Sequence, residues 1–377
     1  MLKERVHTGS GRLKLRIPRG DLLLLLVAAL LIGTPVRGES RASLRIGYIG
    51  SLSGFAAPYG QAVLAGVQLA VEEVVAQGQS VELFIEDDSS DTRTLVSAWQ
   101  KLHSVNRIDA LVTGSWWANS LVPAVARTGI PFLSCETVRD SATRTAANHF
   151  ILAGDLRDWV RAFEPVIAAQ AFRRAAVIRF TSGFGETIAG AMQETFSTPP
   201  RQFAGDLEYT DIHAGELASL VLRLRHLQPD VVYLDAQPES FAVMLRRLGE
   251  LGLGEVPLFT NMVAESALRQ GLVTAAQLSH TVFTRRAAIS AGFAARYVRR
   301  FNRAPELSAD LGYYAVRLVV EAARRGDPVV ALRAGLSEID GIAFSFSPEG
   351  VLRNVRQELC MIDPAGEVRP WTPVAGR

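Results

Sequence analysis

Histidine, cysteine and serine residues occur in the chain, but they do not form a recognisable catalytic pattern. The six histidines are scattered, and none has the spacing typical of zinc ligands. The nucleophile motif Gly-x-Ser-x-Gly and the phosphate-binding motif Gly-x-x-x-x-Gly-Lys-Ser/Thr are both absent. Cys135 follows an expected strand, but no motif supplies a base for it, so we favour a buried structural thiol over a nucleophile. We therefore predict no enzyme activity, no catalytic residue, no cofactor and no metal site.

The densest acidic cluster consists of Glu86, Asp87, Asp88 and Asp91. Carboxylate oxygens are the ligands of hard cations, but the cluster lacks the glycine and the distal glutamate of a calcium loop. Asp91 lies directly before an expected helix that begins at Thr92, where a carboxylate can accept hydrogen bonds from free backbone N–H groups. We favour a strand end followed by a helix cap over a metal site.

A loop with several glycines, Gly47 to Gly54, follows the first expected strand. Loops at the carboxyl ends of parallel strands bind ligands, and glycine lets a ligand approach the backbone. The spacing does not match the dinucleotide motif Gly-x-Gly-x-x-Gly, and the next acidic group, residues 86–88, lies too far along the chain to bind a ribose. We expect a ligand-binding loop here, with a simple tight turn as the alternative.

Two adjacent tryptophans, Trp116 and Trp117, follow another expected buried strand. Exposed indole rings are unfavourable unless something covers them, so we expect at least one of the two in the core. Asn119 or Ser120 is expected to cap the next helix. The free N–H groups of that helix terminus could bind a ligand oxygen.

The elements that position these loops follow an alternating pattern. Short runs that are apolar on both faces predict buried parallel strands, and the segments between them have helical period. The expected strands are 44–49, 81–86, 110–113, 131–134, 149–152, 175–180, 202–207, 231–235, 257–260, 281–284, 342–346 and 355–362. The expected helices include 64–74, one that contains Trp159 and Phe163, 184–196, 217–227, 241–251, 293–301 and 311–323.

This order predicts an α/β fold with two doubly wound, Rossmann-like lobes joined by a hinge of several strands. We expect lobe 1 to contain residues 44–154 and 285–342, and lobe 2 to contain residues 155–284 and 343–365. A chain that passes repeatedly between lobes is suited to closure around a ligand.

Residues 1–38 differ in kind from the rest of the chain. Six basic residues within the first 20 precede an apolar run, 22–32, which is about half of the roughly 20 residues needed to cross a membrane. We expect a signal peptide over 1–38, with an uncut anchor as the alternative, and therefore a periplasmic location.

The charge balance excludes a nucleic-acid partner. Of the 40 basic and 38 acidic residues, seven and two lie in 1–38, which leaves 33 and 36. The rest of the chain is therefore slightly acidic, without the basic clusters that nucleic-acid binding requires. Its only cysteines, Cys135 and Cys360, are too few for a disulfide framework, although one disulfide is permitted outside the cytoplasm.

Five segments resemble, in their order and spacing, the periplasmic branched-chain amino-acid and amide-binding family of ABC transporters, of the type I solute-binding fold. They are Gly50–Gly60, Ile85–Asp91, Gly114–Pro123, Gly129–Ser134 and Phe184–Glu186. The resemblance, to proteins like the Leu/Ile/Val-binding protein, extends from about Leu44 to the last strand. It implies the capture of a small molecule between two lobes and its delivery to a membrane permease by a monomer without a cofactor.

In the first lobe, the resemblance places an aromatic pocket wall at Tyr59. The family serine that holds the ligand carboxylate falls on Ala118, and the threonine that assists it falls on Val138 or Thr137. The two positions of the family's first-lobe disulfide are Ser90 and Trp117 here, so both cysteines are missing.

In the second lobe, the family tyrosines correspond to Phe184 and to a position near Gln237. The acidic partner of the ligand ammonium falls on Asn261 or Met262. Each change removes a polar contact to an α-amino acid. The amide- and urea-binding branch of the family carries an aromatic residue near Trp116, which makes that branch the better analogue.

We therefore hypothesise a ligand more apolar or aromatic than leucine, stacked on aromatic rings and held by a few polar contacts. The predicted ligand-binding residues are Tyr59, Trp116, Trp117, Ala118, Asn119, Glu136, Thr137, Phe184, Gln237, Asn261 and Met262. The alternative function is a periplasmic sensing module that signals to a separate membrane partner. An exported enzyme using Cys135 or the acidic cluster ranks last.

Overall fold

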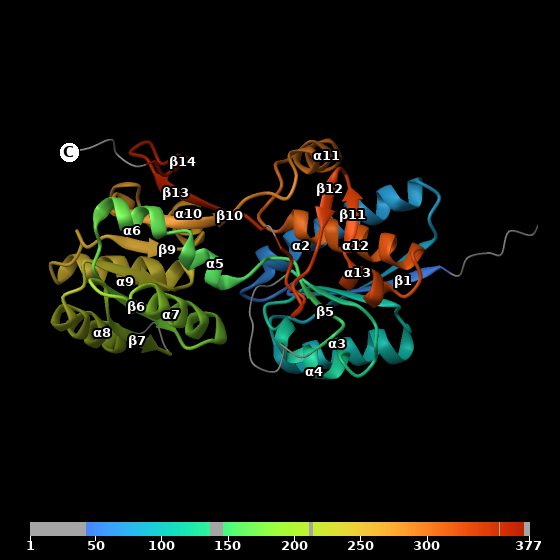
Figure 1. Ribbon diagram of the computed structural model, residues 1–377, viewed down its shortest axis with the longest axis horizontal. Coiled ribbons are helices and arrows are strands. Elements are labelled where there is room, and N and C mark those ends of the chain that lie inside the picture. The colour runs from blue at the N-terminus through green and yellow to red at the C-terminus, as the bar shows by residue number, and fades with distance from the viewer. Residues whose placement is uncertain (1–42, 136–145, 211–213, 354, 373–377) are drawn as a thin grey trace, which may run out of the picture. The chain divides into compact units, whose positions relative to one another are not determined.

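The computed structural model describes residues 43–135, 146–210, 214–353 and 355–372. Within these residues the chain forms two large β-sheets, each with helices against both faces (Figure 1). The predicted α/β fold with two doubly wound lobes is confirmed. The expected signal peptide, residues 1–38, lies outside the described residues.

The first sheet has five parallel strands in the order β2, β1, β3, β4, β5. The strands are β1 (Leu44–Gly50), β2 (Val81–Asp87), β3 (Ala110–Gly114), β4 (Phe132–Ser134) and β5 (His149–Ile151). Every residue of β3, β4 and β5 is buried. Strands covered on both faces are mostly apolar, which is why the sequence pattern revealed them, and the polar exceptions are Thr113, Ser134 and His149.

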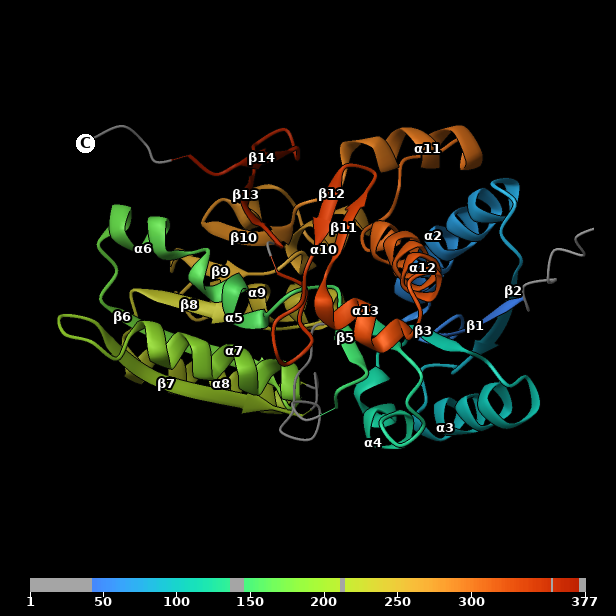
Figure 2. The same cartoon turned by 45° about the vertical axis from the view of Figure 1, so that its right-hand side comes forward.

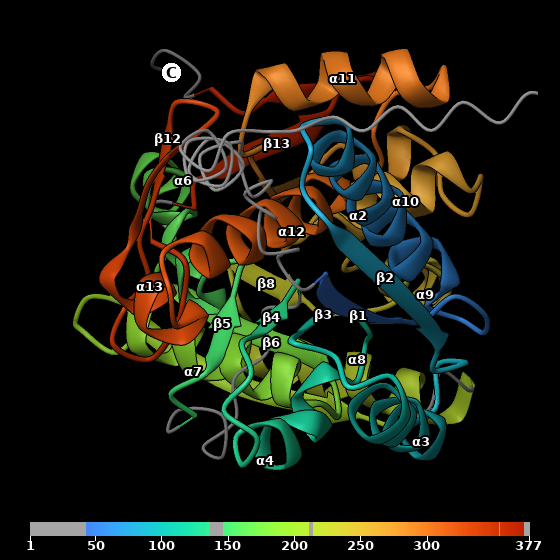
Figure 3. The ribbon, with the colours of Figure 1, turned by 90° about the vertical axis from the view of Figure 1, so that its right-hand side faces the viewer.

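Helices cover both faces of the first sheet (Figure 3). On one face lie α2 (Ala57–Ala76) and α12 (Ala309–Arg324), and on the other lie α3 (Thr92–Gln100) and the short α4 (Val122–Val125). A π-helical turn, Lys101–Val105, continues α3. Although α12 comes late in the chain, it packs beside α2 (Figure 1).

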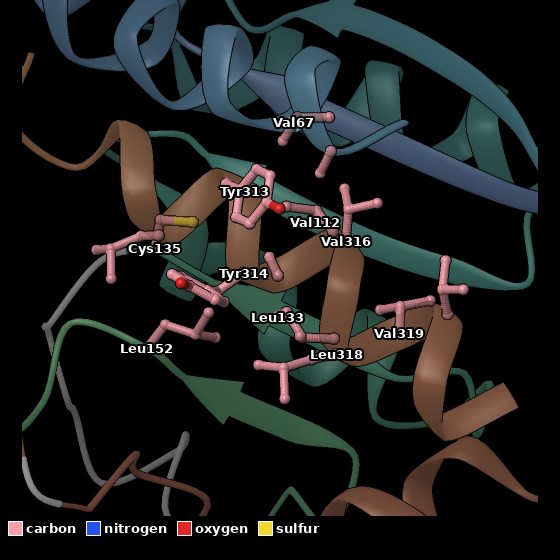
Figure 4. Close-up of a cluster of buried hydrophobic side chains, with 14 of the residues drawn as sticks. Val67, Val112, Leu133, Cys135, Leu152, Tyr313, Tyr314, Val316, Leu318 and Val319 are labelled. Atoms are coloured by element: carbon pink, nitrogen blue, oxygen red, sulfur yellow. The ribbon is translucent and has the colours of Figure 1, made fainter. Parts of the chain in front are cut away.

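The contact between α2 and α12 depends on two glycines. A Cβ atom on Gly66 would lie 1.7 Å from the carbonyl oxygen of Ala309, and one on Gly312 would lie 2.1 Å from the carbonyl oxygen of Val63. No side chain fits in either place, so the two backbones meet directly. The core beside this contact contains Tyr313, Tyr314 and the thiol of Cys135 (Figure 4).

The second sheet has seven strands in the order β14, β13, β10, β9, β8, β6, β7. The parallel strands are β6 (Arg174–Phe180), β7 (Gln202–Tyr209), β8 (Val231–Leu234), β9 (Leu258–Thr260) and β10 (Thr281–Arg286). The antiparallel strands β13 (Gln357–Ile362) and β14 (Val368–Pro370) extend one edge.

Two groups of helices cover the second sheet. On one face lie α5 (Leu156–Arg161), α6 (Glu164–Gln170) and α7 (Gly183–Thr195), and α5 and α7 run side by side (Figure 2). On the other face lie α8 (Ala214–Leu227), α9 (Pro238–Glu250) and α10 (Val263–Arg269). Cys360 belongs to this second face, so it lies in a different core from Cys135.

Between β10 and β13 the chain returns to the first sheet. It forms α11 (Ala291–Phe301), α12, α13 (Pro328–Ala334) and a small antiparallel sheet of β11 (Leu336–Ile339) and β12 (Ile342–Phe344). Arg286, at the end of β10, forms a buried ion pair with Asp310 in the first turn of α12. The residue boundaries predicted for the two lobes remain a prediction.

Most sequence-based element predictions are confirmed to within a few residues. The single helix expected around Trp159 is wrong, because the chain forms two helices, with Pro165 in the first turn of the second. Proline has no N–H and favours a helix start at this point. The short elements α10, α13, β11 and β14 were not predicted. No helix in the described segments is both long and apolar enough to span a membrane.

Candidate functional site

Three loops follow the carboxyl ends of β1, β2 and β3, and the strand register brings them together at one edge of the first sheet. Gly50 is paired with Asp87 on one side and with Gly114 on the other. The loops contain residues 51–56, 88–91 and 115–117, and we call them the first-sheet loops. Ligands of parallel α/β sheets bind beyond the carboxyl ends of the strands, so this edge is the first part of the candidate site.

The glycines at this edge accommodate a tyrosine. The buried Tyr48 hydroxyl donates a 2.7 Å hydrogen bond to the carbonyl oxygen of Gly60. A Cβ atom on Gly50 or Gly114 would lie 2.4 Å from that hydroxyl oxygen. Burial, with smaller effects of Cys135 and Asp88, raises the pKa of Tyr48 well above its usual value, so the phenol stays protonated. Tyr48 therefore fills the space beside Gly50 and Gly114, and the expected role of the Gly47–Gly54 loop in ligand binding remains a prediction.

Asp87 joins the first-sheet loops that follow β1 and β2. One of its oxygens accepts the N–H groups of Leu52 at 2.9 Å, Ser53 at 3.2 Å and Ser89 at 2.7 Å, and the other accepts the Ser53 hydroxyl at 2.6 Å. Burial alone would raise the pKa of Asp87, but these hydrogen bonds outweigh it and hold the pKa below its usual value. The carboxylate therefore stays ionised within the loop.

Asp91 caps α3 as predicted. Its carboxylate accepts the N–H groups of Arg93 at 2.9 Å and Thr94 at 3.0 Å. Glu86, at the end of β2, forms an ion pair with Lys101 at 2.6 Å. The prediction of a strand end followed by a helix cap is confirmed. Over the described ranges, no group of three or more His, Cys, Asp or Glu side chains could hold a metal ion.

Phe55, Tyr59 and Trp116 form an aromatic group, which we call the aromatic wall; Phe55 and Trp116 are exposed, and Tyr59 is half-buried against the core. The ring of Trp116 meets those of Phe55 and Tyr59 edge to face, with centroids 6.2 Å and 6.3 Å apart. Phe55 is 61% exposed and Trp116 is 36% exposed. Sequence reasoning missed Phe55, although a large aromatic residue in a glycine-containing loop was a usable signal.

The expectation that Trp116 or Trp117 lies in the core is wrong. Trp117 is 38% exposed, much like Trp116, because both indoles lie in the loop beyond β3. The two tryptophans lie between buried residues, Ser115 before them and Ala118 after them, and Ala118 packs under α3 with Trp99.

The helix cap predicted after the tryptophans is also wrong. The chain forms a 3-10 turn over Ala118–Leu121 and then α4, and neither terminus has a side-chain cap. Asn119 is half-buried and Ser120 is exposed within that turn. Because α4 has only four residues, it offers no helix terminus of the kind expected to bind a ligand oxygen.

The second sheet brings Phe184 to the carboxyl end of β6. Ser182 caps α7 by accepting the N–H of Gly185 at 3.0 Å, which places Phe184 in the first turn. Phe184 is half-buried and packs edge to face against Trp159, with centroids 5.8 Å apart. One side of its ring is therefore held by the core.

The other predicted residues of the second sheet follow β8 and β9. Gln237 is the exposed cap of α9, and its N–H donates to the Ser240 hydroxyl at 3.0 Å. Asn261 is buried, and its side-chain oxygen accepts the N–H of Val263 at 2.9 Å. Met262 is half-buried at the start of α10. These side chains lie at one edge because parallel strands end there together.

Asp235 is a buried carboxyl group at this edge that sequence reasoning did not single out. It follows β8 and is 7% exposed, and a Cβ atom on Gly185 would lie 3.0 Å from its Oδ2. Burial raises its pKa to about 7, and the hydrogen bond from the Phe180 N–H and the charge of Arg179 only partly oppose this. An acidic residue at the end of an apolar strand was the available signal.

The predicted ligand-binding residues thus fall into two described groups. Tyr59, Trp116, Trp117, Ala118 and Asn119 belong to the first sheet, and Phe184, Gln237, Asn261 and Met262 belong to the second. Glu136 and Thr137 lie outside the described residues. The role of all these residues in binding remains a prediction.

Comparisons with known proteins agree with this architecture. The sequence pattern of the family described as "Periplasmic binding protein" matches residues 43–357. The "Leu/Ile/Val-binding protein homolog 7" of Brucella melitensis biotype 1 is 24% identical over 352 residues, which cover 85% of this chain and 86% of the relative.

Two solved structures share the fold. One is the branched-chain amino acid transporter substrate-binding protein LivJ from Streptococcus pneumoniae, in complex with isoleucine, which has a TM-score of 0.70 at 20% identity. The match covers 86% of this chain and 97% of the LivJ chain. An ABC transporter solute-binding protein from R. palustris, in complex with benzoate, has a TM-score of 0.70 at 19% identity. The match covers 87% of this chain and 95% of the R. palustris chain.

Two lobes built on sheets of mainly parallel strands define the class of type I solute-binding proteins. This chain belongs to the periplasmic binding protein family. The members of this family are substrate-binding components of ABC transporters and are not enzymes.

Proposed function

We propose that the chain captures a small organic solute between its two lobes and delivers it to the membrane permease of an ABC transporter. We further propose that this solute is aromatic or amide-like rather than a branched-chain amino acid.

The aromatic wall is the observation that carries the ligand class. Phe55, Tyr59 and Trp116 come from two first-sheet loops and the first turn of α2, and the ring of Trp116 contacts the other two. Exposed aromatic side chains such as Phe55 and Trp116, gathered at the carboxyl ends of the strands, indicate a surface that a bound molecule covers. Aromatic rings favour stacked or edge-to-face partners by about 0.5–1.5 kcal/mol beyond the area they bury, so a planar solute fits this surface best.

The second sheet supports the same ligand class. The positions that the family resemblance links to the ammonium of an amino acid hold Asn261 and Met262, and neither carries a negative charge. The side-chain oxygen of Asn261 already accepts the N–H of Val263. A hydrogen bond between an ammonium and a carboxylate is about twice as strong as one between neutral groups. The absence of a carboxylate at these positions therefore disfavours the binding of amino acids.

The related structures offer precedents for both ligand classes. The S. pneumoniae protein was solved with isoleucine and the R. palustris protein with benzoate, so the shared fold holds either kind of solute. The aromatic wall of this chain is better suited to the second kind.

A binding experiment tests the proposal. The chain is titrated with benzoate, benzamide, leucine and valine, and binding is followed by calorimetry and tryptophan fluorescence. We expect saturable binding of benzoate or benzamide, weakened about tenfold in Trp116→Ala, with leucine and valine inert. Trp371→Phe, at a tryptophan packed against the second sheet, is the matched control. Tight binding of leucine or valine with inert aromatic solutes would refute the proposed ligand class.

We also propose that residues 1–38 direct export to the periplasm and are removed, and that the exported protein is a monomer. Mass spectrometry of protein recovered from the periplasm tests both points. An intact mass that starts after Gly38, in a native spectrum with one chain per particle, is the expected result. An intact mass that still includes residues 1–38 would contradict their removal, and two chains per particle would contradict the monomer.

A further inference from the structure

Trp117 uses its indole N–H within the protein. Its Nε1 donates a 3.0 Å hydrogen bond to the carbonyl oxygen of Ser90, which belongs to the loop after β2. Its backbone N–H donates to the Ser115 hydroxyl at 3.0 Å. Trp117 therefore links two of the first-sheet loops through its side chain.

The loop segment that Trp117 contacts has an unfavourable backbone conformation. Ser89 and Ser90 both lie in the left-handed region, with φ of 53° and 55°. Residues other than glycine rarely adopt this region, so neighbouring groups must hold the turn in place. The carboxylates of Asp87 and Asp88 accept the N–H groups of Ser89 and Ser90 at 2.7 Å, and Trp117 holds the Ser90 carbonyl.

The Ser89–Ser90 turn also fixes the loop that carries Phe55. The Ser90 hydroxyl donates to the carbonyl oxygen of Ser53 at 2.8 Å and accepts the N–H of Ala56 at 3.2 Å. A Cβ atom on Gly54 would lie 2.7 Å from the same hydroxyl oxygen. Phe55 is therefore held on both sides by contacts to Ser90.

A second chain of hydrogen bonds reaches Trp116. Asp88 is completely buried and accepts the Ser51 hydroxyl at 3.2 Å. The Ser51 oxygen accepts the backbone N–H of Trp116, also at 3.2 Å. Two members of the aromatic wall, Phe55 and Trp116, are thus attached to one network that contains the Ser89–Ser90 turn.

We propose that Trp117 is a positioning residue, which holds the Ser89–Ser90 turn and thereby orders Phe55 and Trp116 before the solute arrives. The inference rests on the proposed function, in which the aromatic wall binds the solute. It gives the two adjacent tryptophans different roles: Trp116 presents its ring to the solute and Trp117 fixes the loops. Ser90 and Trp117 are also the two positions that the family resemblance associates with a disulfide. In this chain a hydrogen bond between the same two residues links the loops instead.

Hydrogen exchange of the solute-free full chain tests the inference, with rates followed by mass spectrometry. The reporters are the amides of Ser53, Ala56 and Ser90, whose N–H groups bond to side chains of the network. Trp117→Phe keeps an aromatic ring but removes the donor. We expect exchange at the reporters to become about fivefold to tenfold faster, as the loss of one net hydrogen bond implies.

Two variants serve as controls. Trp116→Phe alters the neighbouring ring and should leave the reporter amides unchanged, whereas Asp88→Asn weakens the same network and should speed their exchange. The amides of α9, in the second sheet, report global unfolding and should stay protected in every variant. Unchanged reporter exchange in Trp117→Phe would overturn the inference, as would an equal effect of Trp116→Phe.

Benzoate titration of the same variants separates this inference from the proposed function. Trp116→Phe should weaken binding without faster exchange, and Trp117→Phe should show both effects. Weaker binding in Trp117→Phe without faster exchange would mean that Trp117 contacts the solute directly, which overturns the positioning role. Benzamide replaces benzoate in this titration if only benzamide binds. If neither solute binds the unaltered chain, the proposed ligand class fails, and the exchange rates still decide the role of Trp117.

Discussion

Replacing Asp235 with asparagine should stabilise the folded protein, and the gain should grow with pH. The Asp235 carboxyl is buried under the first turn of α7, and burial raises its pKa from 3.8 to about 7. Ionisation is therefore unfavourable in the folded state, although Arg179 and the Phe180 N–H partly support the charge. Asparagine has nearly the same shape, keeps an oxygen for the Phe180 N–H, and never ionises.

The magnitude follows from the pKa difference between the two states. A group whose pKa is higher in the folded state contributes stability that is fully present below the unfolded pKa and is lost as pH rises through the folded pKa. The pKa of Asp235 differs by about three between the states, and each pH unit is worth about 1.36 kcal/mol, so the full loss is about 4 kcal/mol. Roughly 2–3 kcal/mol of this loss falls between pH 5 and pH 8.

Urea unfolding of Asp235→Asn and of the unaltered chain at pH 5, 6, 7 and 8 measures this effect. Taking the difference between the two proteins cancels the titration of all other groups. We expect Asp235→Asn to gain about 2–3 kcal/mol relative to the unaltered chain as the pH rises from 5 to 8. Asp87→Asn is the control without pH dependence: the pKa of Asp87 is lowered, so this carboxylate is ionised in both the folded and the unfolded state from pH 5 to 8, and its replacement should destabilise the protein by an amount that does not change over this range. A difference for Asp235→Asn that does not change with pH would refute the reasoning.

Three further substitutions test the fold by thermal or urea unfolding. Asp91→Ala removes the cap of α3 and should lower the unfolding midpoint, whereas Asp91→Ser, which can accept the same N–H groups, should keep most of the stability. Gly312→Ala forces a methyl group against the Val63 carbonyl and should cost about 1–3 kcal/mol or more, and no loss would contradict the close helix contact. Arg286→Met leaves Asp310 buried without its partner and should cost about 3–5 kcal/mol, and recovery in the double variant Arg286→Met/Asp310→Leu would identify the unpaired charge as the cause.

The parallel strands could be predicted from sequence because their signal is local. Strands such as β3 and β8 are buried on both faces and are therefore almost wholly apolar. The cap at Asp91 was predictable for the same reason, since the carboxylate and the N–H groups that it accepts lie within four residues. Short elements such as α4 carry too few residues to show a period.

Features that depend on distant residues could not be predicted. Tyr48 occupies the space above Gly50, and the contact becomes visible only once the strands are in register. The link between Trp117 and the Ser90 carbonyl joins positions that are 27 residues apart, and it involves a backbone atom that has no sequence signature. The aromatic wall was predicted in part, through Tyr59 and Trp116, whereas Phe55 joins it because of the loop conformation.

Native mass spectrometry of the exported protein, purified without added solutes from cells grown in rich medium, tests the central claim most directly. The claim is that one aromatic or amide-like solute binds per chain. We predict a spectrum with one small molecule bound to each chain. On release this molecule has a mass and fragment pattern containing an aromatic ring or a primary amide, and the fraction of chains that carry it is lower in Trp116→Ala. Leucine, isoleucine or valine as the released molecule would contradict the account.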